Sequence, residues 1–548
     1  MAYFILSLIS LVAAVYLIRR HLLQDGRKQQ GRLPPGPRRL PLLGNVFDLP
    51  KSGEAEFRHW IKHRERFGPI SSLVVLGTTY IMIHDRQLVD QLLQKESSKT
   101  SDRPRSEFGL EMCGLSDYMP LYYDSTFRLR RRLMHQQLGT AKLVARFDHV
   151  QEVEAKRFLI RILDEPDATI EHLKHTTSAI ILKTTYGYTV KARGTDPLID
   201  LIDRMSKNLV LSTVPWPVDL IPALKYLPEG LPGSGFKKTA RRWKKINKAV
   251  IDVPYDFVRR QMAAGKKHAP CFVSRLCDES PSLGSEDEVA IKRVAAAMYL
   301  GGADTTVTVL TSFILAMMLF PEVQRKGQEA IDELLRGQDR LPTFADQDRL
   351  PLITAIVKET FRWSPVAPLA IPHAASQDLH CGEYTIPKGS VLVPMVWWFL
   401  HDPAVYPDPE SFKPERYLGP EAQPDPIVVF GYGRRVCPGR YFAEANVFLI
   451  VARLLACFHI RKAVDEEAGV EVEPELDVYP GLHSHLKKFQ YKIEVRDRKR
   501  ADSIRRLQRE EEEEEEEEEQ RQQEGESGTG GDGHLLDNDV IRDCLKGT

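Results

Sequence analysis

The sequence is poor in cysteine and shows no cysteine framework. Seven cysteines are scattered through 548 residues. Their number is odd, and no two of them form a Cys-x-x-Cys pair. Domains held by disulfides and cysteine-rich zinc modules need paired, closely spaced cysteines. The pattern therefore predicts neither a disulfide framework nor a zinc site, and it indicates a reducing compartment in which at most one thiol does chemistry.

The chain as a whole also has no net charge, but its charges are unevenly distributed along the sequence. The chain holds 76 basic and 76 acidic residues. Residues 501–548 carry 17 acidic and 6 basic side chains, which leaves 70 basic and 59 acidic side chains in the first 500 residues. The body is thus mildly basic and the tail strongly acidic. Because Glu510 to Glu519 is an unbroken glutamate run that lacks apolar residues, we predict a disordered acidic tail over residues 499–548.

The first 18 residues, MAYFILSLISLVAAVYLI, carry no charge, and two arginines follow them. As a helix this run is roughly 27 Å long, close to the thickness of a bilayer core. A cleaved signal peptide, the alternative, carries its positive charge before the apolar run. We therefore predict a transmembrane anchor over residues 1–20, with the body on the cytosolic side. A basic, proline-rich linker over residues 21–45 follows, in which LPPGP favours an extended backbone.

The pattern of apolar residues predicts a mainly α body with a small β part. Helical spacing dominates from about residue 55 to residue 360, and short β patterns occur near 71–83, 384–396 and 489–495. One long helix is expected to begin at Ser285, with Glu288 completing a capping box, and to end near Met318. We find no internal repeat, and we place the folded body at residues 46–498.

Cys437 stands apart from the other cysteines because it lies in FGYGRRVCPGR, a stretch rich in glycine and arginine. Pro438 suits the first position of a helix, and the apolar pattern of residues 441–458 predicts that helix. Cys437 would then be the N-cap residue, where free amides and the helix dipole favour a negatively charged sulfur. A thiolate of this kind suits a metal ligand.

This stretch resembles the heme-binding signature of the cytochrome P-450 family, F-x-x-G-x-R-x-C-x-G, at all five fixed positions. The five are Phe430, Gly433, Arg435, Cys437 and Gly439. The resemblance implies a heme b cofactor with Cys437 as the axial thiolate of its iron, and Arg435 as a partner of a heme propionate. Thiolate ligation favours cleavage of the O–O bond.

A second segment, LGGADTT, ending at Thr306, resembles the oxygen-activation motif of the same family. The resemblance implies that Asp304 and Thr305 are catalytic residues beside a groove that admits O2. Gly301 and Gly302 would widen that groove at a cost of roughly 1 kcal/mol each relative to alanine. The alternative is that the two glycines only form a packing notch between helices.

Two further motifs resemble the structural elements of the family. Glu359 and Arg362 match E-x-x-R, and Arg416 in Pro-Glu-Arg-Tyr matches P-x-R. Residues three apart share a helix face, so the first two can form an ion pair. The resemblance implies that all three form a buried ionic set in the heme-side core.

The basic segment FRLRRR, residues 127–132, lies where the family has W-R-x-x-R-R. The resemblance implies that Arg131, together with Arg128, binds a heme propionate. Phe127 in place of tryptophan removes an indole donor. His373 matches a position that meets the other propionate, although an ordinary loop histidine is the alternative. The sequence has no nucleic-acid-binding signature that would give this basic run another role.

The resemblance covers about residues 30–498 and extends most closely to fungal microsomal members of secondary metabolism, similar to O-methylsterigmatocystin oxidoreductases. It implies a single-domain cytochrome P-450 fold on the endoplasmic reticulum membrane. The expected activity is a monooxygenase that uses O2 to hydroxylate or oxidise an apolar small molecule. Because the sequence has no flavin or nicotinamide domain, electrons would come from a separate NADPH-cytochrome P-450 reductase. The family analogy places the substrate pocket at residues 106–121, 209–231, 366–371 and 481–482.

Two other functions stay open at this point. One is an oxygen-independent heme-thiolate isomerase or dehydratase, whose members often lack the acid–alcohol pair. The other is a non-catalytic heme-binding protein. The presence of both Asp304 and Thr305 favours the monooxygenase over each of them.

Overall fold

The structure is a computed structural model that describes residues 32–41, 43–51, 53–191, 194–213, 215–264, 270–279, 284–465, 467–525 and 536–545. The predicted anchor over residues 1–20 lies outside these ranges, as does the linker before residue 32. Among the described helices one, Ser285–Leu319, is long and apolar enough to cross a membrane, and most of its apolar stretch is buried inside the protein.

Helices dominate the described chain and strands are short, as the sequence predicted. The helices are α2 (Glu56–Phe67), α3 (Arg86–Val89), α4 (Ser125–Leu138), α5 (Ala141–Val144), α6 (Asp148–Asp164), α7 (Thr169–Tyr186), α8 (Pro197–Thr213), α9 (Pro217–Leu220), α10 (Gly235–Ala263), α11 (Phe272–Asp278), α12 (Ser285–Leu319), α13 (Pro321–Leu334), α14 (Pro351–Trp363), α15 (Val396–His401), α16 (Arg440–Cys457), α17 (Arg498–Gly525) and α18 (Asn538–Leu545). The strands are β1 (Ile70–Val75), β2 (Thr78–Ile83), β3 (His373–Ala374), β4 (Leu379–Cys381), β5 (Tyr384–Ile386), β6 (Val391–Pro394), β7 (Phe458–Lys462), β8 (Val464–Asp465), β9 (Val470–Glu471) and β10 (Tyr491–Val495).

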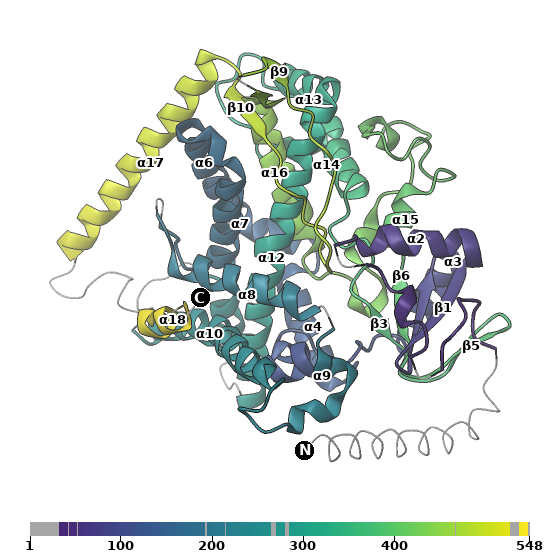
Figure 1. Cartoon of the computed structure of the whole chain (residues 1–548). Helices are drawn as coiled ribbons and strands as arrows, with labels where there is room; N and C mark the ends of the chain where they lie inside the picture. The colour runs from purple at the N-terminus through teal and green to yellow at the C-terminus, as the bar shows by residue number, and fades with distance from the viewer. Residues whose placement is uncertain are drawn as a thin grey trace.

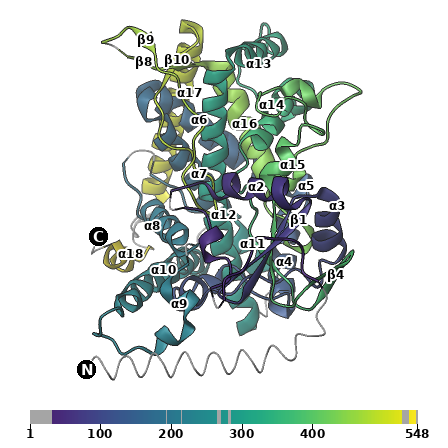
Figure 2. The same ribbon diagram turned by 45° about the vertical axis from the view of Figure 1, so that its right-hand side comes forward.

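Helix α12 runs through the middle of the helical part, between α7 and α16 (Figures 1 and 2). It is apolar on nearly all sides, which suits a helix surrounded by protein. It begins at Ser285, as predicted, and ends at Leu319. The predicted capping box is absent, because Gly284 is the N-cap residue. The Glu288 carboxylate instead accepts a hydrogen bond of 3.2 Å from the Tyr255 hydroxyl on α10.

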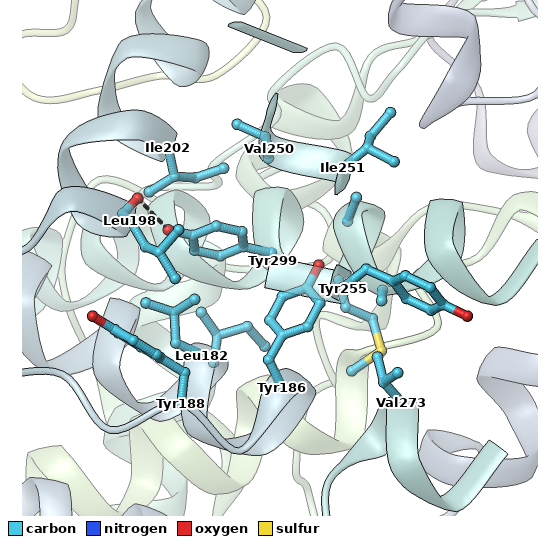
Figure 3. Close-up of a cluster of buried hydrophobic side chains, with 14 of the residues drawn as sticks. Leu182, Tyr186, Tyr188, Leu198, Ile202, Val250, Ile251, Tyr255, Val273 and Tyr299 are labelled. Carbon is cyan, nitrogen blue, oxygen red and sulfur yellow. Dashed lines mark hydrogen bonds between the residues drawn. The ribbon is translucent and has the colours of Figure 1, made fainter. Parts of the chain in front are cut away.

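A cluster of buried tyrosines and aliphatic side chains joins α7, α8, α10 and α12 (Figure 3). Tyr299 of α12 is fully buried, and its hydroxyl donates a hydrogen bond to the Leu198 carbonyl at the start of α8. Tyr186 packs edge-on against Tyr299, with ring centroids 6.1 Å apart. A buried tyrosine ring contributes a large apolar area to the core, and a hydrogen bond from its hydroxyl, as in Tyr299, fixes the orientation of the ring. This cluster fixes α8 and α10 over the middle of α12.

A small sheet lies beside the helical part, on the right in Figure 1. β1 and β2 form the predicted antiparallel hairpin, in which Ile70 pairs with Ile83. β2 continues into a parallel pair with β6, and β6 pairs with β3. β10 pairs with β7 in a separate sheet. The turn at residues 387–389 joins β5 to β6, which belong to different sheets.

The described end of the proline-rich linker lies against this sheet. The Ser72 amide of β1 donates to the Pro35 carbonyl at 2.8 Å, and the Ser72 hydroxyl donates to the Pro34 carbonyl at 2.6 Å. A Cβ atom at Gly36 would lie 1.8 Å from the Ser72 carbonyl oxygen. Only glycine fits so close an approach. The extended backbone expected from the prolines is therefore part of the body from residue 32 onward.

The tail differs from the prediction of disorder over residues 499–548, because its described residues form helices α17 and α18. α17 packs against α6 (Figure 1), and Ile504 is fully buried in that contact. Arg505 bonds Asp164 of α6 at 2.6 Å. In α18, Ile541 is buried against the cluster that contains α8 and α10. The prediction averaged composition over the glutamate run and overlooked these apolar and basic residues around it, while residues 526–535 and 546–548 lie outside the described ranges.

Candidate functional site

The loop that carries Cys437 is closed by short backbone contacts. The Cys437 amide donates to the Phe430 carbonyl at 2.7 Å. Gly433 has φ +54°, and a Cβ atom there would lie 2.2 Å from the Leu93 carbonyl oxygen. The Gly433 amide donates to the Gln94 side-chain oxygen at 2.7 Å. Positive φ and the close approach together require glycine at this position, which fixes the loop against the short π-helix Asp90–Lys95.

Cys437 does not occupy the predicted N-cap position. α16 begins at Arg440 with Gly439 as its N-cap residue, so Cys437 lies two residues before the cap. Burial raises the pKa of the Cys437 thiol, whereas a hydrogen bond from the Gly439 amide and the charges of Arg131 and Arg440 act in the opposite direction. A metal cation at the sulfur would supply the remaining stabilisation of the thiolate. The Gly439 amide, Arg131 and Arg440 thus favour the thiolate form of Cys437, which is the form that binds a metal.

Three arginines from distant segments gather behind this loop. Arg131 of α4 donates to the Val436 carbonyl at 2.6 Å, and Arg435 donates to the Ser101 carbonyl at 2.6 Å. Arg103 donates to two carbonyls of residues 371–372, at 2.5 and 2.8 Å. Within the described ranges, none of the three forms an ion pair with a carboxylate.

The three arginines are half-buried and repel one another. Burial, followed by the charges of Arg435 and Arg131, lowers the pKa of Arg103 to about 9. Burial likewise lowers the pKa of Arg435 to about 10, although the charge of Asp102, which forms no ion pair with it, acts in the opposite direction. Buried cations without a counter-ion are costly. The set therefore fits a ligand with carboxylate groups, as the two propionates of heme b are.

His373 lies beside these cations. Its Nδ1 atom is 2.8 Å from the Thr100 carbonyl oxygen, and the side chain is buried. Burial, and then repulsion by Arg103 and Arg435, lowers the pKa of His373 to about 3. The ring is therefore neutral near pH 7, with Nδ1–H donating to the carbonyl and Nε2 left as an acceptor.

Arg128 and Phe127 differ in their surroundings from the other residues of the basic segment. Arg128 is exposed and lies over the Tyr123 ring, 5.6 Å from its centroid. The buried Phe127 ring lies under the Arg435 guanidinium at 4.1 Å and near that of Arg131 at 6.0 Å. Stacking on an aromatic face holds a guanidinium without any hydrogen bond. Phe127 thus positions two of the cations, whereas Arg128 faces solvent.

Arg103 is the member of this cation set that the sequence did not indicate. It lies in no motif of the family, and its carbonyl partners are 268 and 269 residues away along the chain. The surrounding sequence, SDRPRSE at residues 101–107, carries no pattern that would reveal such a contact.

On α12 the two glycines of the second motif have different environments. A Cβ atom at Gly302 would lie 2.7 Å from the Ile181 side chain on α7, whereas at Gly301 it would meet no atom within 4 Å. Gly302 thus makes a packing notch, and Gly301 leaves open space on the helix. The Thr305 hydroxyl donates to the Gly301 carbonyl at 2.6 Å, beside that space.

Asp304 points toward two histidines of the segment that precedes β10. Its Oδ2 atom is 3.2 Å from His485 Nε2 and 3.8 Å from His483 Nδ1. Burial alone would raise the pKa of Asp304, but the two imidazoles outweigh burial and hold the pKa well below its usual range. Asp304 is therefore a carboxylate at any ordinary pH.

Glu359, Arg362 and Arg416 meet in the core beneath the Cys437 loop. Arg362 Nε is 2.7 Å from Glu359 Oε2, and Arg416 Nε is 3.2 Å from Glu359 Oε1. The Lys413 amide donates to the same Oε1 atom at 2.8 Å, and Arg362 also donates to the Leu400 carbonyl at 2.9 Å. Every charge in this buried set is therefore paired.

Comparison with known proteins assigns the chain to a family. The family model for cytochrome P450 matches residues 34–492. The "Multifunctional cytochrome P450 monooxygenase af510" of Aspergillus fumigatus is 45% identical over 496 residues, which cover 88% of this chain and 92% of the relative. The "Cytochrome P450 monooxygenase CLM2" of Gibberella zeae is 44% identical over 501 residues, 89% of this chain and 94% of the relative. An O-methylsterigmatocystin oxidoreductase of Aspergillus flavus is 37% identical over 483 residues, 87% of this chain and 90% of the relative.

These relatives confirm the resemblance to fungal monooxygenases. The enzyme class is that of a monooxygenase, an oxidoreductase that uses O2, a redox partner and a small-molecule substrate. Its cofactor is heme b with a cysteine thiolate as axial ligand. With a match over most of its length and a site that suits this cofactor, the chain belongs to the cytochrome P450 family.

Proposed function

We propose that this chain is a membrane-anchored monooxygenase of fungal secondary metabolism that hydroxylates or oxidises an apolar small molecule. The observation that carries the proposal is that the Cys437 loop lies beside three half-buried arginines, Arg103, Arg131 and Arg435, which form no ion pair with a carboxylate within the described residues. When bound there, heme b supplies the activation of O2. Cys437 would hold its iron, and Arg103, Arg131 and Arg435 would surround its propionates. A propionate beside His373 would favour the protonated ring, whose Nε2–H could then donate to it while Nδ1–H stays on the Thr100 carbonyl.

Thr305 and Asp304 on α12 would control the delivery of protons to O2. The Thr305 hydroxyl hydrogen is directed to the Gly301 carbonyl, so its oxygen lone pairs are free to accept from a water molecule. That water can donate into the open space at Gly301. The Asp304 carboxylate, one residue earlier, stays ionised and can orient the water molecules that carry protons inward from solvent. In this role Thr305 holds the proton donor and Asp304 directs its resupply.

The expected substrate segments meet in the structure, which supports a pocket between them. A Cβ atom at Gly481 would lie 3.7 Å from a methyl group of Val210 on α8. A Cβ atom at Gly109 would lie 3.2 Å from the Ser212 carbonyl oxygen. Three of the four proposed pocket segments therefore touch along the end of α8.

The fourth segment joins through a backbone hydrogen bond, because the Ser484 amide donates to the Val366 carbonyl at 2.8 Å. Trp216, which lies in the expected pocket segment 209–231, packs against other aromatic side chains. It stacks on Phe108 with ring centroids 3.8 Å apart and packs edge-on against Trp243. Trp216 thus stabilises the wall of this region.

Electrons would arrive from a separate NADPH-cytochrome P450 reductase at the face outside Cys437. Arg434 is exposed and bonds the Tyr123 hydroxyl, and exposed Arg128 lies over the same ring. Both cations therefore lie within a short distance of the loop that carries Cys437. A positive patch of this kind favours docking of an acidic partner surface. We place the body on the cytosolic side of the endoplasmic reticulum, with residues 1–20 as the anchor.

The test is a binding screen with the purified heme protein and an extract of host metabolites. A substrate that displaces water from the iron shifts the heme absorption spectrum, and turnover with NADPH and reductase should then give a product with one added oxygen atom. Conversion of the bound compound without O2 or NADPH would overturn the monooxygenase and favour the isomerase or dehydratase.

A further inference from the structure

Asp304, His483 and His485 form a compact group that we call the loop histidine cluster. Asp304 comes from α12, and the two histidines come from the segment between Tyr479 and Leu486. Their ligand atoms all lie within 4.8 Å of one another, and all three side chains are half-buried. The His483 and His485 rings are inclined at 70° to each other, with centroids 6.3 Å apart. Two imidazoles and one carboxylate thus converge on one point.

Thr308, one turn further along α12, orients one of these rings. Its hydroxyl oxygen is 3.1 Å from His485 Nδ1 and 3.3 Å from the Asp304 carbonyl oxygen. When the hydroxyl donates to the carbonyl, it accepts from Nδ1–H. The Nε2 lone pair of the neutral ring then faces Asp304 Oδ2 at 3.2 Å. In the other tautomer Nε2–H donates to Asp304 Oδ2 while Nδ1 accepts from the Thr308 hydroxyl, and a metal ion between Nε2 and Oδ2 would take the place of that proton.

The spacing of the three ligand atoms suits a small divalent ion. Tetrahedral Zn²⁺ with bonds of about 2.0–2.1 Å separates its ligand atoms by roughly 3.3–3.4 Å. The two distances from Asp304 Oδ2, 3.2 and 3.8 Å, bracket that value. A small rotation of the half-exposed His483 ring would complete the set. Nitrogen ligands select transition metals over Mg²⁺ and Ca²⁺, which prefer oxygen.

We infer that Asp304, His483 and His485 bind a divalent transition-metal ion, with Zn²⁺ as the best match. The site is separate from the heme-binding residues and leaves a fourth position for water. Thr308 would act as the outer hydrogen-bond partner that fixes the tautomer and direction of His485. The poor cysteine pattern could not reveal this site, because its ligands are histidines and a carboxylate.

The expected consequence rests on the proposed role of Asp304 in proton delivery. A bound ion would occupy the Asp304 carboxylate and would hold the segment containing Gly481 against α12. Since Gly481 also lies close to Val210 of α8, the ion would restrict the same region of the proposed pocket. Zinc should therefore lower product yield per NADPH while the heme content and the spectrum of the ferrous–CO complex stay unchanged.

The experiment uses the full-length heme protein, freed of metal with a chelator and titrated with ZnCl₂ by calorimetry. The wild type should bind one more zinc ion than the His483→Gln/His485→Gln double variant. Thr308→Val should weaken that binding by about 10–100-fold through loss of the outer partner. His149→Gln, which removes an exposed histidine of α6, is the matched control and should bind zinc as the wild type does. MgCl₂ should give no saturable binding at this site.

The ferrous–CO spectrum of each variant verifies that it is folded and holds heme. Equal zinc stoichiometry in the wild type and the double variant overturns the metal site. Zinc that fills the site without lowering product yield overturns the role of Asp304 in proton delivery and leaves the metal site standing.

Discussion

Arg362 and Glu359 lie one turn apart on α14, both fully buried, with Arg362 Nε 2.7 Å from Glu359 Oε2. Glu359 is also the partner of Arg416 and of the Lys413 amide. A buried ionic set of this kind is sensitive to the loss of one member, because the partners left behind are charged and desolvated.

Glu359→Gln should therefore destabilise the fold by about 3–5 kcal/mol, since two buried guanidinium groups lose their counter-ion. Thermal unfolding of the purified protein measures this loss. Glu415→Gln is the control. Glu415 pairs with Lys326 at the solvent-exposed surface, and this pair should contribute about 1 kcal/mol or less to the free energy of unfolding. Similar unfolding temperatures for the two variants would contradict the structural role of Glu359.

Arg131→Ala should reduce heme content much more than Arg128→Ala. Arg131 lies in the cation set behind Cys437, whereas Arg128 is exposed over Tyr123. Both variants replace an arginine of α4 by alanine, so a change in helix propensity cannot explain a difference in heme content between them. The measurement is the ratio of heme absorbance to protein absorbance after purification. Equal ratios would show that Arg131 does not hold a propionate.

Arg434→Glu should slow reduction of the heme by the reductase, and added salt should narrow the difference from wild type. Arg434 and Arg128 are the two exposed cations that lie over the Tyr123 ring. Arg498→Glu makes the same charge change at the start of α17, far along the chain from Cys437, and serves as the control. Stopped-flow reduction under CO gives the rate. An equal loss in both variants would mean that only net charge matters.

Ile504→Ala should destabilise the protein by about 2–5 kcal/mol, because Ile504 is fully buried where α17 meets α6. Ser503→Ala removes only an exposed hydrogen bond to Asp339 and is the matched control. Deletion of residues 501–548 should also destabilise the body, contrary to what the acidic composition suggested. A deletion variant as stable as the full chain would show that α17 contributes nothing to the fold.

The contrast between the tail and the Cys437 loop shows what the sequence could predict. Local patterns were reliable where local residues decide the structure, as in the β1–β2 hairpin and the start of α12 at Ser285. The capping box failed because Glu288 finds a partner in Tyr255 of another helix. The N-cap prediction for Cys437 failed because α16 begins only at Arg440.

Contacts between distant segments account for the rest. Arg103 reaches carbonyl groups more than 260 residues away, and no periodicity or spacing encodes such a meeting. The loop histidine cluster likewise needs the segment before β10 to lie over α12. Each motif identifies residues within one short stretch of sequence. These two sites combine residues from distant stretches, which come together only when the chain folds.

The hydroxyl of Thr305 gives the most direct test of the proposed chemistry. Thr305→Ala should keep the helix and the heme, because alanine is the better helix former. Loss of the hydroxyl should remove the water that donates a proton into the space at Gly301. Positioned proton transfer contributes roughly 10²–10⁴-fold, so product formation should fall strongly while NADPH consumption continues and hydrogen peroxide accumulates.

Thr305→Ser restores the hydroxyl and should recover most of the product. The competing explanation is that the bond from Thr305 to the Gly301 carbonyl, at 2.6 Å, is only a local backbone contact. Under that explanation the alanine variant would form as much product per NADPH as the wild type, measured with a true substrate and reductase. That result would remove Thr305 from the mechanism.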